Sequence, residues 1–540
     1  MSKNSGFQKI LLVFLGLFFI LYFFRLGSTG LIDVDEPRYA EAAREMLESG
    51  NFIVPYFNYE VRFDKPVFFY YMTAISMKLF GQNEFSARFP SVLSSLFCLV
   101  FLFYFTKKFY GSIFALLSVL VLMSSLEFAA LSRFSIPDMT LTSFISCSIF
   151  SFFLGYNNLL LSNRFVHLQI KSFSIWYLAG FIFLALAVLT KGPMAMLLVF
   201  IVLFPFFWWT RQLEYFLKNK SFWLGFLLFM FMVFPWFLLV HNATGGEFTK
   251  VFFGLHNFQR YTSVVSGHSG SVFYYFLVIL LGFMPWSFFL VQSIYFVLKK
   301  GVKDILPWFC LWWIIVVLCF FSISKTKLLT YILPIFPACS ILVALLFYEA
   351  IQQKKYRDLL SIGFGILFLF AVVISYICLF HIGTLLPSDV KGLRLDEEIL
   401  FLLFVMLVGV SMAWASSNNS IKITFLITVS SFFLINSSLI ILLLPKIDKY
   451  SQYLLRSFSQ SIPKNIELAT FQIMKPSIVF YSTRRVNKIN NIDKLQEKLD
   501  SDSKFVFITK KKLLEGVELD NAYLLGDDTR YVVYGNFPKS

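Results

Sequence analysis

The chain has 540 residues, of which 58% are hydrophobic, 20% aromatic and only 14% charged, and its mean hydropathy is +0.73. Soluble domains are about half apolar and about a quarter charged, so this composition excludes a soluble globular protein and predicts a polytopic membrane protein. The net charge of +16 arises partly from basic residues in loops, and it therefore gives no support for nucleic-acid binding.

Apolar segments long enough to cross a bilayer recur along most of the chain. A membrane-spanning helix needs roughly 20 predominantly apolar residues. We separate two of the segments at TKGP, because Gly192-Pro193 would break a helix. The pattern then predicts about thirteen spans, near residues 9–27, 89–106, 112–130, 137–160, 175–190, 194–210, 222–241, 271–298, 306–323, 328–348, 359–380, 399–416 and 422–444.

Basic residues are concentrated in alternate loops, which predicts the sidedness of the bundle. In short loops Lys and Arg mark the cytoplasmic side, so we expect the N-terminus in the cytoplasm. An odd number of spans then places the C-terminus on the outer side. The loops assigned to the cytoplasm carry KK at 107, Arg164 and Lys171, RQLEYFLKNK at 211, KKGVK at 299 and KKYR at 354.

The first outer loop, residues 28–88, contains LIDVDEPRYAEAAREMLESG, with three acids, Asp33, Asp35 and Glu36, within four positions. Apolar residues recur with helical spacing from 36 to 49, which predicts an amphipathic helix along the membrane surface. Asp35 is well placed as its N-cap, with a proline in the first turn and a glycine at the end. Capping accounts for only one of the three acids.

The same loop continues with NFIVPYFNYEVRFDKPVFFYY, in which Asp64 and Lys65 precede a row of aromatic residues. An adjacent acid and base beside aromatic rings suits a phosphorylated, sugar-bearing lipid. The alternative is that Lys65 only extends its ammonium group to the lipid headgroups.

The last part of the chain is hydrophilic and predicts a separate domain. We place the membrane domain at residues 1–445 and a small α/β domain at 446–540. Three β-rich segments, SIVFYS, KFVFIT and RYVVYG, alternate with polar helical stretches such as IDKLQEKL.

Several motifs of the outer loops together resemble one known family. They are DEPRYAEAAREM, NFIVPYFNYEVRFDKP, TKGP, HNFQRYTS followed by FYYFLVILLGFMPWS, and FSISKTKLLTYILPIFPA, in the expected order over residues 10–345. The chain resembles the lipid A aminoarabinose transferases, which are GT-C glycosyltransferases related to the protein O-mannosyltransferases.

The resemblance implies a fold, a location and a reaction. The fold would be an all-α polytopic membrane bundle of the GT-C type, with periplasmic surface helices and a small C-terminal α/β periplasmic domain. The protein would lie in the bacterial inner membrane as a monomer among membrane lipids. It would take a sugar from undecaprenyl phosphate and place it on a phosphate of lipid A at the periplasmic face.

Such a reaction needs cations at one point just outside the bilayer, because the leaving group is a phosphate. The outer loops offer Lys65, Arg260, and Lys325 or Lys327, with Tyr331 as a hydrogen-bond donor. The resemblance implies that Lys65, Arg260 and Tyr331 bind the phosphate of the carrier lipid. The alternative for each is an ordinary anchor at the membrane surface.

The resemblance also implies essential acids at Asp35 and at Asp138 in SIPDM. An acceptor phosphate is already anionic, so these acids would orient the sugar and stabilise positive charge rather than remove a proton. Capping of the helix that starts at Pro137 is the alternative for Asp138. Arg38 and Lys191 are candidates for contact with the acceptor phosphates, or with native anionic lipids.

A divalent metal ion is a further expectation from the resemblance, with Asp64 and His256 as its ligands. Two residues so far apart in sequence form a weak metal motif, and a lone histidine is more often structural.

Two other functions remain open on the sequence alone. One is a related transferase that modifies protein hydroxyls or another glycan. The other is a transporter or flippase of lipid-linked sugars, which would carry ionisable groups at mid-membrane. The predicted spans hold almost none apart from Glu127, whereas polar motifs gather at one interface, which favours chemistry on a lipid. Aminoarabinose, galactosamine and a neutral hexose would each fit as the sugar.

We expect that replacing Lys65 or Arg260 with Ala weakens binding of undecaprenyl phosphate, because each removes a cation from the phosphate site. Titration of the purified proteins with the carrier lipid measures the change. Equal affinity in the wild type and both variants would refute the assignment.

Overall fold

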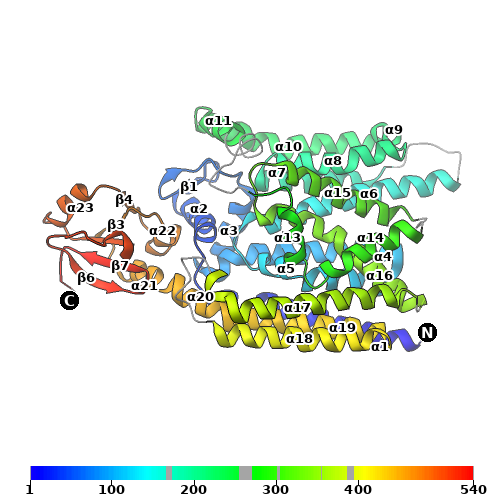
Figure 1. Cartoon of the computed structure of the whole chain (residues 1–540). Helices are drawn as coiled ribbons and strands as arrows, with labels where there is room; N and C mark the ends of the chain where they lie inside the picture. Colours follow the sequence, from blue (N-terminus) through cyan, green and yellow to red (C-terminus); the bar gives the residue numbers. More distant parts are fainter. Residues whose placement is uncertain are drawn as a thin grey trace.

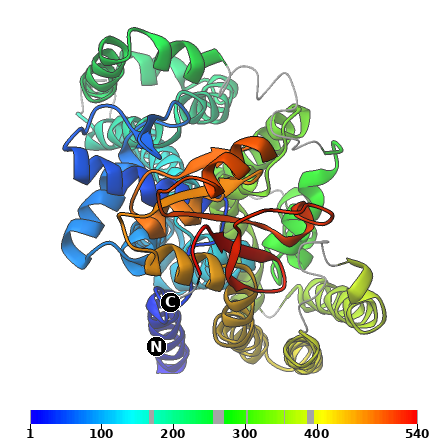
Figure 2. The same cartoon turned by 90° about the vertical axis from the view of Figure 1, so that its left-hand side faces the viewer.

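The computed structural model describes residues 2–165, 173–254, 270–300, 304–353, 355–385 and 395–538. Long helices form a bundle with roughly parallel axes, and a small domain with a β-sheet lies beyond one end of it (Figure 1). The N-terminus lies at the opposite end of the bundle (Figure 1). Viewed from the C-terminal side, the sheet lies in front of the bundle (Figure 2).

Helices of the bundle overlap each of the thirteen predicted spans in sequence. Nine described helices are long and apolar enough to cross a membrane, and a bent pair with an angle of 105° could form a tenth. The number of spans stays a prediction. The bundle helices are α1 (Ser2–Phe23), α4 (Glu84–Ser124), α5 (Leu126–Leu131), α6 (Pro137–Phe165), α7 (Ile175–Lys191), α8 (Met194–Trp209), α9 (Leu213–Lys218), α10 (Lys220–Ala243), α11 (Glu247–Phe253), the bent pair α13 (Tyr274–Gly282) and α14 (Ser287–Lys300), α15 (Ile305–Ile323), η2 (Leu329–Ile335), α16 (Phe336–Gln353), α17 (Arg357–Leu385), α18 (Asp396–Ser417), α19 (Ile421–Ser438) and η4 (Leu439–Leu443).

The α4 segment consists of two helices that meet at Gly111. This glycine has a φ of 83°, a conformation that residues with a Cβ rarely adopt. A straight helix of 41 residues would be about 60 Å long, twice the thickness of the hydrocarbon core. The break therefore lies where the sequence predicts a loop between two spans.

The first long loop, residues 28–88, contains α2 (Asp35–Ser49), a short hairpin of β1 (Tyr56–Phe57) and β2 (Glu60–Val61), and α3 (Phe68–Phe80). The predicted amphipathic helix is confirmed, and Gly50 ends it with a φ of 68°. The predicted N-cap is wrong: Val34 is the cap residue, and Asp35 is the first residue of the helix without a capping hydrogen bond. The helix α2 also contacts α3 and the C-terminal domain, and most of its side chains are buried, while its position along the membrane surface stays a prediction.

A buried ion pair joins this loop to the bundle. Arg88 of α4 donates two hydrogen bonds, of 2.9 and 2.8 Å, to the two carboxylate oxygens of Glu36. The backbone N–H of Ser135 donates to the same carboxylate at 2.7 Å. The Arg88 guanidinium also donates to the backbone carbonyls that precede α2, namely those of Leu26, Thr29 and Gly30.

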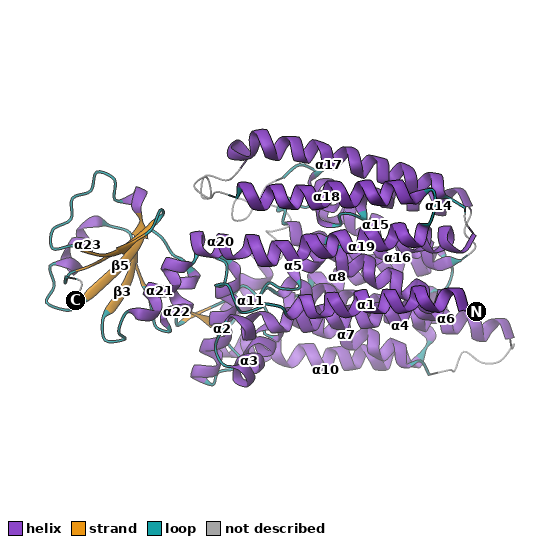
Figure 3. Ribbon diagram, turned by 90° about the horizontal axis from the view of Figure 1, so that it is seen from below, coloured by secondary structure: helices purple, strands orange, loops and turns teal. Residues whose placement is uncertain are grey.

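The C-terminal domain has a five-stranded sheet in the order β4-β3-β5-β7-β6, which holds five of the seven strands in the described part of the chain (Figure 3). Strand β3 pairs in parallel with β4 and with β5. Strand β7 pairs antiparallel with β5 and with β6. The core of the domain consists of two apolar clusters that are separate from the core of the bundle. The elements are α20 (Leu444–Ser451), α21 (Tyr453–Ser461), β3 (Glu467–Phe471), α22 (Pro476–Ser482), β4 (Asn487–Ile489), α23 (Ile492–Leu499), β5 (Phe505–Lys510), η5 (Lys511–Leu513), β6 (Tyr523–Asp527) and β7 (Tyr531–Gly535).

Two of the three predicted strands are confirmed, because KFVFIT forms β5 and RYVVYG forms β7, and IDKLQEKL forms the predicted helix α23. The third prediction is wrong: SIVFYS forms the helix α22. Pro476 starts this helix, and all of its side chains are buried, with Phe480 and Tyr481 in a cluster that includes Ala40 and Ala43 of α2. Packing against α2 thus overrides the β propensity of its apolar residues.

A second carboxylate cluster lies on α2. Arg44 donates two hydrogen bonds of 2.7 Å to Glu41, while the Glu45 carboxylate accepts from the backbone N–H of Tyr59 and lies beside the Glu41 carboxylate. Burial and the neighbouring Glu41 carboxylate raise the pKa of Glu45 to about 8. Between about pH 4.3 and about pH 8, the Glu45 carboxyl therefore keeps its proton in the folded protein but loses it in the unfolded chain.

We expect that replacing Arg88 with Met lowers the free energy of unfolding by about 3–5 kcal/mol, because Glu36 would keep a buried charge without its partner. Thermal denaturation of the detergent-solubilised protein measures the loss. As a control, Arg485→Ala breaks an exposed ion pair with Glu60 and should cost about 0–1 kcal/mol. Equal melting temperatures for the two variants would contradict this account.

We expect stability to fall as pH rises from about 4.3, the ordinary pKa of a glutamate, towards about 8, and then to level off, because the folded state retains the Glu45 proton. Glu45→Gln should remove this dependence, so that the variant melts above the wild type at about pH 9 and close to it at about pH 4.5. Melting curves across this range test the prediction, with Glu60→Gln as the exposed control. Parallel curves for the wild type and Glu45→Gln would refute it.

Candidate active site

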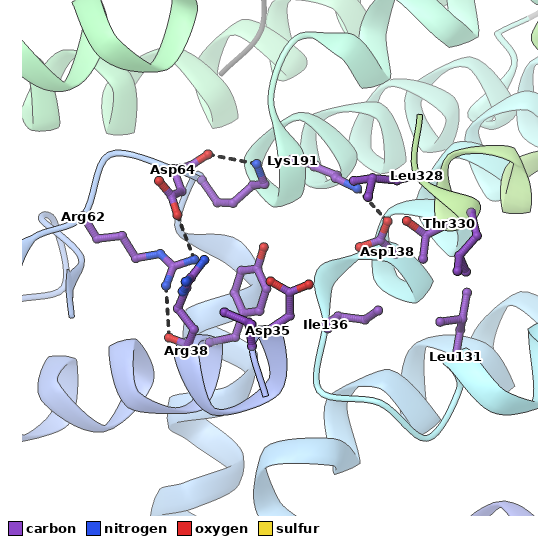
Figure 4. A pocket seen from close by; sticks show the side chains of 14 residues that line it. Asp35, Arg38, Arg62, Asp64, Leu131, Ile136, Asp138, Lys191, Leu328 and Thr330 are labelled. Atoms are coloured by element: carbon purple, nitrogen blue, oxygen red, sulfur yellow. Dashed lines mark hydrogen bonds and ion pairs between the residues drawn. The ribbon is translucent and has the colours of Figure 1, made fainter. Parts of the chain in front are cut away.

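A cavity of about 600 Å³ lies where the first loop meets the ends of α6 and α7 (Figure 4). Four basic and three acidic side chains line it, so its ionised lining carries a net charge of +1. The complete lining is Val34, Asp35, Arg38, Tyr39, Arg62, Asp64, Lys65, Leu131, Ile136, Asp138, Lys191, Leu328, Leu329 and Thr330.

The cavity brings together most of the site residues predicted from the sequence, although they come from distant parts of the chain. Six of the ten line it: Asp35, Arg38, Asp64, Lys65, Asp138 and Lys191. Tyr331 lies beside it, since the Lys191 ammonium is 5.1 Å from the centre of its ring. Arg260 and His256 lie outside the described residues.

Asp138 and Lys191 form an ion pair on one side of the cavity. The Lys191 Nζ donates to Asp138 Oδ1 at 2.6 Å, and Thr330 lies beside the same carboxylate (Figure 4). Asp138 is in the first turn of α6, and Lys191 is the last residue of α7. Both charges are favourable at those helix ends. The TKGP motif fixes Lys191 there, because Gly192, with a φ of 102°, ends α7.

The opposite side of the cavity is built around Arg62, which the sequence analysis missed. Its buried guanidinium lies 4.9 Å from the centre of the Tyr39 ring and pairs with Asp64 at 3.1 Å. It also donates to the backbone carbonyl of Arg38 at 3.2 Å. The Lys65 ammonium donates to the backbone carbonyl of Asp64 at 3.0 Å. A charged residue between apolar neighbours in YEVRFDKP was the available signal for Arg62.

Asp35 and Arg38 are oriented towards the open part of the cavity (Figure 4). Among the described residues, neither side chain forms a hydrogen bond or an ion pair. Asp138 and Asp64 are both paired with cations. Asp35 is therefore the carboxylate of this cavity whose oxygens are available to a ligand.

Unlike the predicted site residues Lys65 and Lys191, Lys327 lies outside the cavity lining. Its ammonium donates to the backbone carbonyls of Phe321, Ser322 and Ser324 at 3.0, 2.7 and 2.7 Å. All three of its N–H groups are used in this way. Lys327 thus stabilises the chain between α15 and η2, and its role as a phosphate ligand stays a prediction.

The predicted metal site has one described residue, Asp64. Its carboxylate pairs with Arg62, and the described ranges contain no group of three or more His, Cys, Asp and Glu residues arranged to hold a metal ion. The described residues therefore do not form a metal centre by themselves. The divalent ion stays a prediction.

Comparisons with known proteins find a family model of mannosyltransferases, an arabinosyl transferase and an uncharacterised relative. A family model described as dolichyl-phosphate-mannose-protein mannosyltransferase matches residues 8–244. An undecaprenyl phosphate-α-4-amino-4-deoxy-L-arabinose arabinosyl transferase from Shewanella sediminis is 34% identical over 69% of this chain and 66% of its own length. An uncharacterised protein from Aquifex aeolicus is 32% identical over 66% of this chain and 77% of its own.

A solved structure has the same fold over the whole chain. It is ArnT from Cupriavidus metallidurans bound to undecaprenyl phosphate, which is 22% identical, with a TM-score of 0.81 and 99% of both chains covered. The sequence match, by contrast, spans just under two thirds of the Shewanella protein.

Proposed function

The chain belongs to the family of membrane glycosyltransferases that includes the undecaprenyl phosphate-aminoarabinose arabinosyl transferases, and we propose on this basis that it transfers 4-amino-4-deoxy-L-arabinose from undecaprenyl phosphate to a phosphate of lipid A. The observation that carries the proposal is the convergence of Asp35, Lys65 and Lys191 in one cavity. A lipid-linked sugar phosphate and an anionic acceptor need this mixture of charges.

The first requirement of the reaction is a site for the leaving phosphate. When the bond between the sugar carbon and the phosphate oxygen breaks, its electron pair stays on the oxygen and negative charge accumulates there. Lys65 supplies a fixed positive charge to this phosphate, and Arg260 and Tyr331 complete its binding site. Such preorganised charge lowers the barrier because it interacts most strongly with the transition state.

The second requirement is control of the sugar and the acceptor. An oxygen of the lipid A phosphate forms the new bond to the sugar carbon, and no proton has to be removed from it. Asp35 orients the sugar and stabilises positive charge on its ring in the transition state. Lys191, held by Asp138, and Arg38 bind the acceptor phosphates.

The charge of the loops supports the proposed orientation in the inner membrane. The basic segment around α9 lies at the same end of the bundle as the N-terminus (Figure 1). Basic loops favour the cytoplasmic side, which supports a periplasmic cavity and C-terminal domain. A cavity at the outer surface is accessible to both lipids. We propose that a single copy of the chain carries out the reaction.

A second candidate is transfer of a sugar from a polyprenyl phosphate to a hydroxyl group of a protein or glycan. The match to the protein mannosyltransferase model favours it. A hydroxyl acceptor would need a general base, and Asp35 has no partner among the described residues that would prevent this role.

We expect Asp35→Asn to reduce transfer by about 10²–10³-fold, the usual effect of removing one group that stabilises the transition state. Mass spectrometry of lipid A from cells with the wild type, the variant or neither identifies the sugar and its position. The exposed Glu60 of the same loop, changed to Gln, serves as the control and should retain full activity. Unchanged lipid A modification with Asp35→Asn would remove this residue from the mechanism, and modification of a protein instead of lipid A would support the second candidate.

A further inference from the structure

The chain just before α2 is held by the C-terminal part of the protein. The backbone N–H of Gly30 donates to Asp448 Oδ1 at 2.8 Å, and that of Leu31 donates to the Tyr481 hydroxyl at 2.8 Å. Asp448 lies in α20 and Tyr481 in α22. These contacts join positions more than 400 residues apart in the sequence.

The strongest of these contacts involves Asp33, two residues before Asp35. Its carboxylate accepts hydrogen bonds from the backbone N–H of Ser477 at 3.0 Å and from the Ser477 hydroxyl at 2.6 Å. The Gln452 side chain donates to it at 3.4 Å. Ser477 is fully buried and Asp33 is half-buried, so these hydrogen bonds are partly shielded from water.

The membrane domain holds the same stretch from its other side. Arg88 donates to the carbonyls of Thr29 and Gly30 and to the carboxylate of Glu36. Tyr481 also donates to Glu84 of α4 at 3.1 Å, which ties the two sides together. Residues 29–36 are therefore fixed on both sides.

We propose that the C-terminal domain positions Asp35 for sugar transfer, with Asp33 and Ser477 as positioning residues. The inference rests on the proposed function, in which Asp35 touches the sugar. Asp33 is bound to α22, and Asp35 follows it by two residues at the start of α2. A displacement of about 1 Å of a reacting group can reduce the rate about 10²-fold, so this contact can control turnover without touching either substrate.

Ser477→Ala tests the proposal, because it removes the hydroxyl and keeps the backbone N–H. We expect kcat to fall at least about 10-fold while the Kd for undecaprenyl phosphate stays within about twofold, since the phosphate site is untouched. Asp33→Ala removes every contact of this carboxylate and should have a larger effect. Ser477→Thr keeps the hydroxyl and should restore most of the rate.

Arg485→Ala is the matched control, because it removes an exposed contact between the same two parts of the protein, to Glu60, far from residues 30–33 in sequence. It should leave kcat unchanged. If Ser477→Ala retains the wild-type kcat, or loses kcat and lipid binding together as the melting temperature falls, the positioning role is refuted.

Hydrogen exchange of the peptide around residues 30–35 gives a readout that needs no turnover. We expect Ser477→Ala to raise the exchange rate there at least about 10-fold, and Arg485→Ala to leave it unchanged. Unchanged exchange in Ser477→Ala would overturn the inference even if the sugar donor proves to be another one. An inactive wild type with the expected exchange pattern would instead contradict the proposed function alone.

Discussion

The buried ion pair between Arg88 and Glu36 is the contact on which the site depends. Both side chains are almost completely buried, and the bidentate geometry joins the first helix of the outer loop to the start of a membrane helix. A charge at this depth is stable only when its partner and its hydrogen bonds are all in place. The pair therefore fastens the loop to the bundle, and in this arrangement Asp35 and Arg38 line the same cavity as Asp138 and Lys191.

The three acids at the start of α2 have three separate tasks. Glu36 holds the helix on the bundle, Asp33 binds the C-terminal domain, and Asp35 faces the cavity.

Some of the charged side chains that line the cavity are paired with one another, and others are not. Within each of the pairs Asp138–Lys191 and Asp64–Arg62 the two charges cancel. The remaining side chains, Asp35, Arg38 and Lys65, leave a net charge of +1 for an anionic ligand.

The sequence predicted what depends on local patterns. The amphipathic spacing from 36 to 49 predicted α2, apolar length predicted the membrane helices, and the resemblance predicted most of the acids and bases in the cavity. Contacts between distant segments could not be predicted in this way. Glu36 and Arg88 are 52 residues apart, and no periodicity connects them. Similarly, α22 has the composition of a strand, and only its burial against α2 explains why it is a helix.

We propose that one cavity, lined by Asp35 and Lys65, binds a sugar carried on a polyprenyl phosphate. A structure of the purified protein with undecaprenyl phosphate bound tests this claim most directly. It should show the phosphate within hydrogen-bond distance of Lys65, with space for a sugar between it and Asp35. A phosphate bound elsewhere on the protein, with the cavity filled only by solvent, would contradict the account.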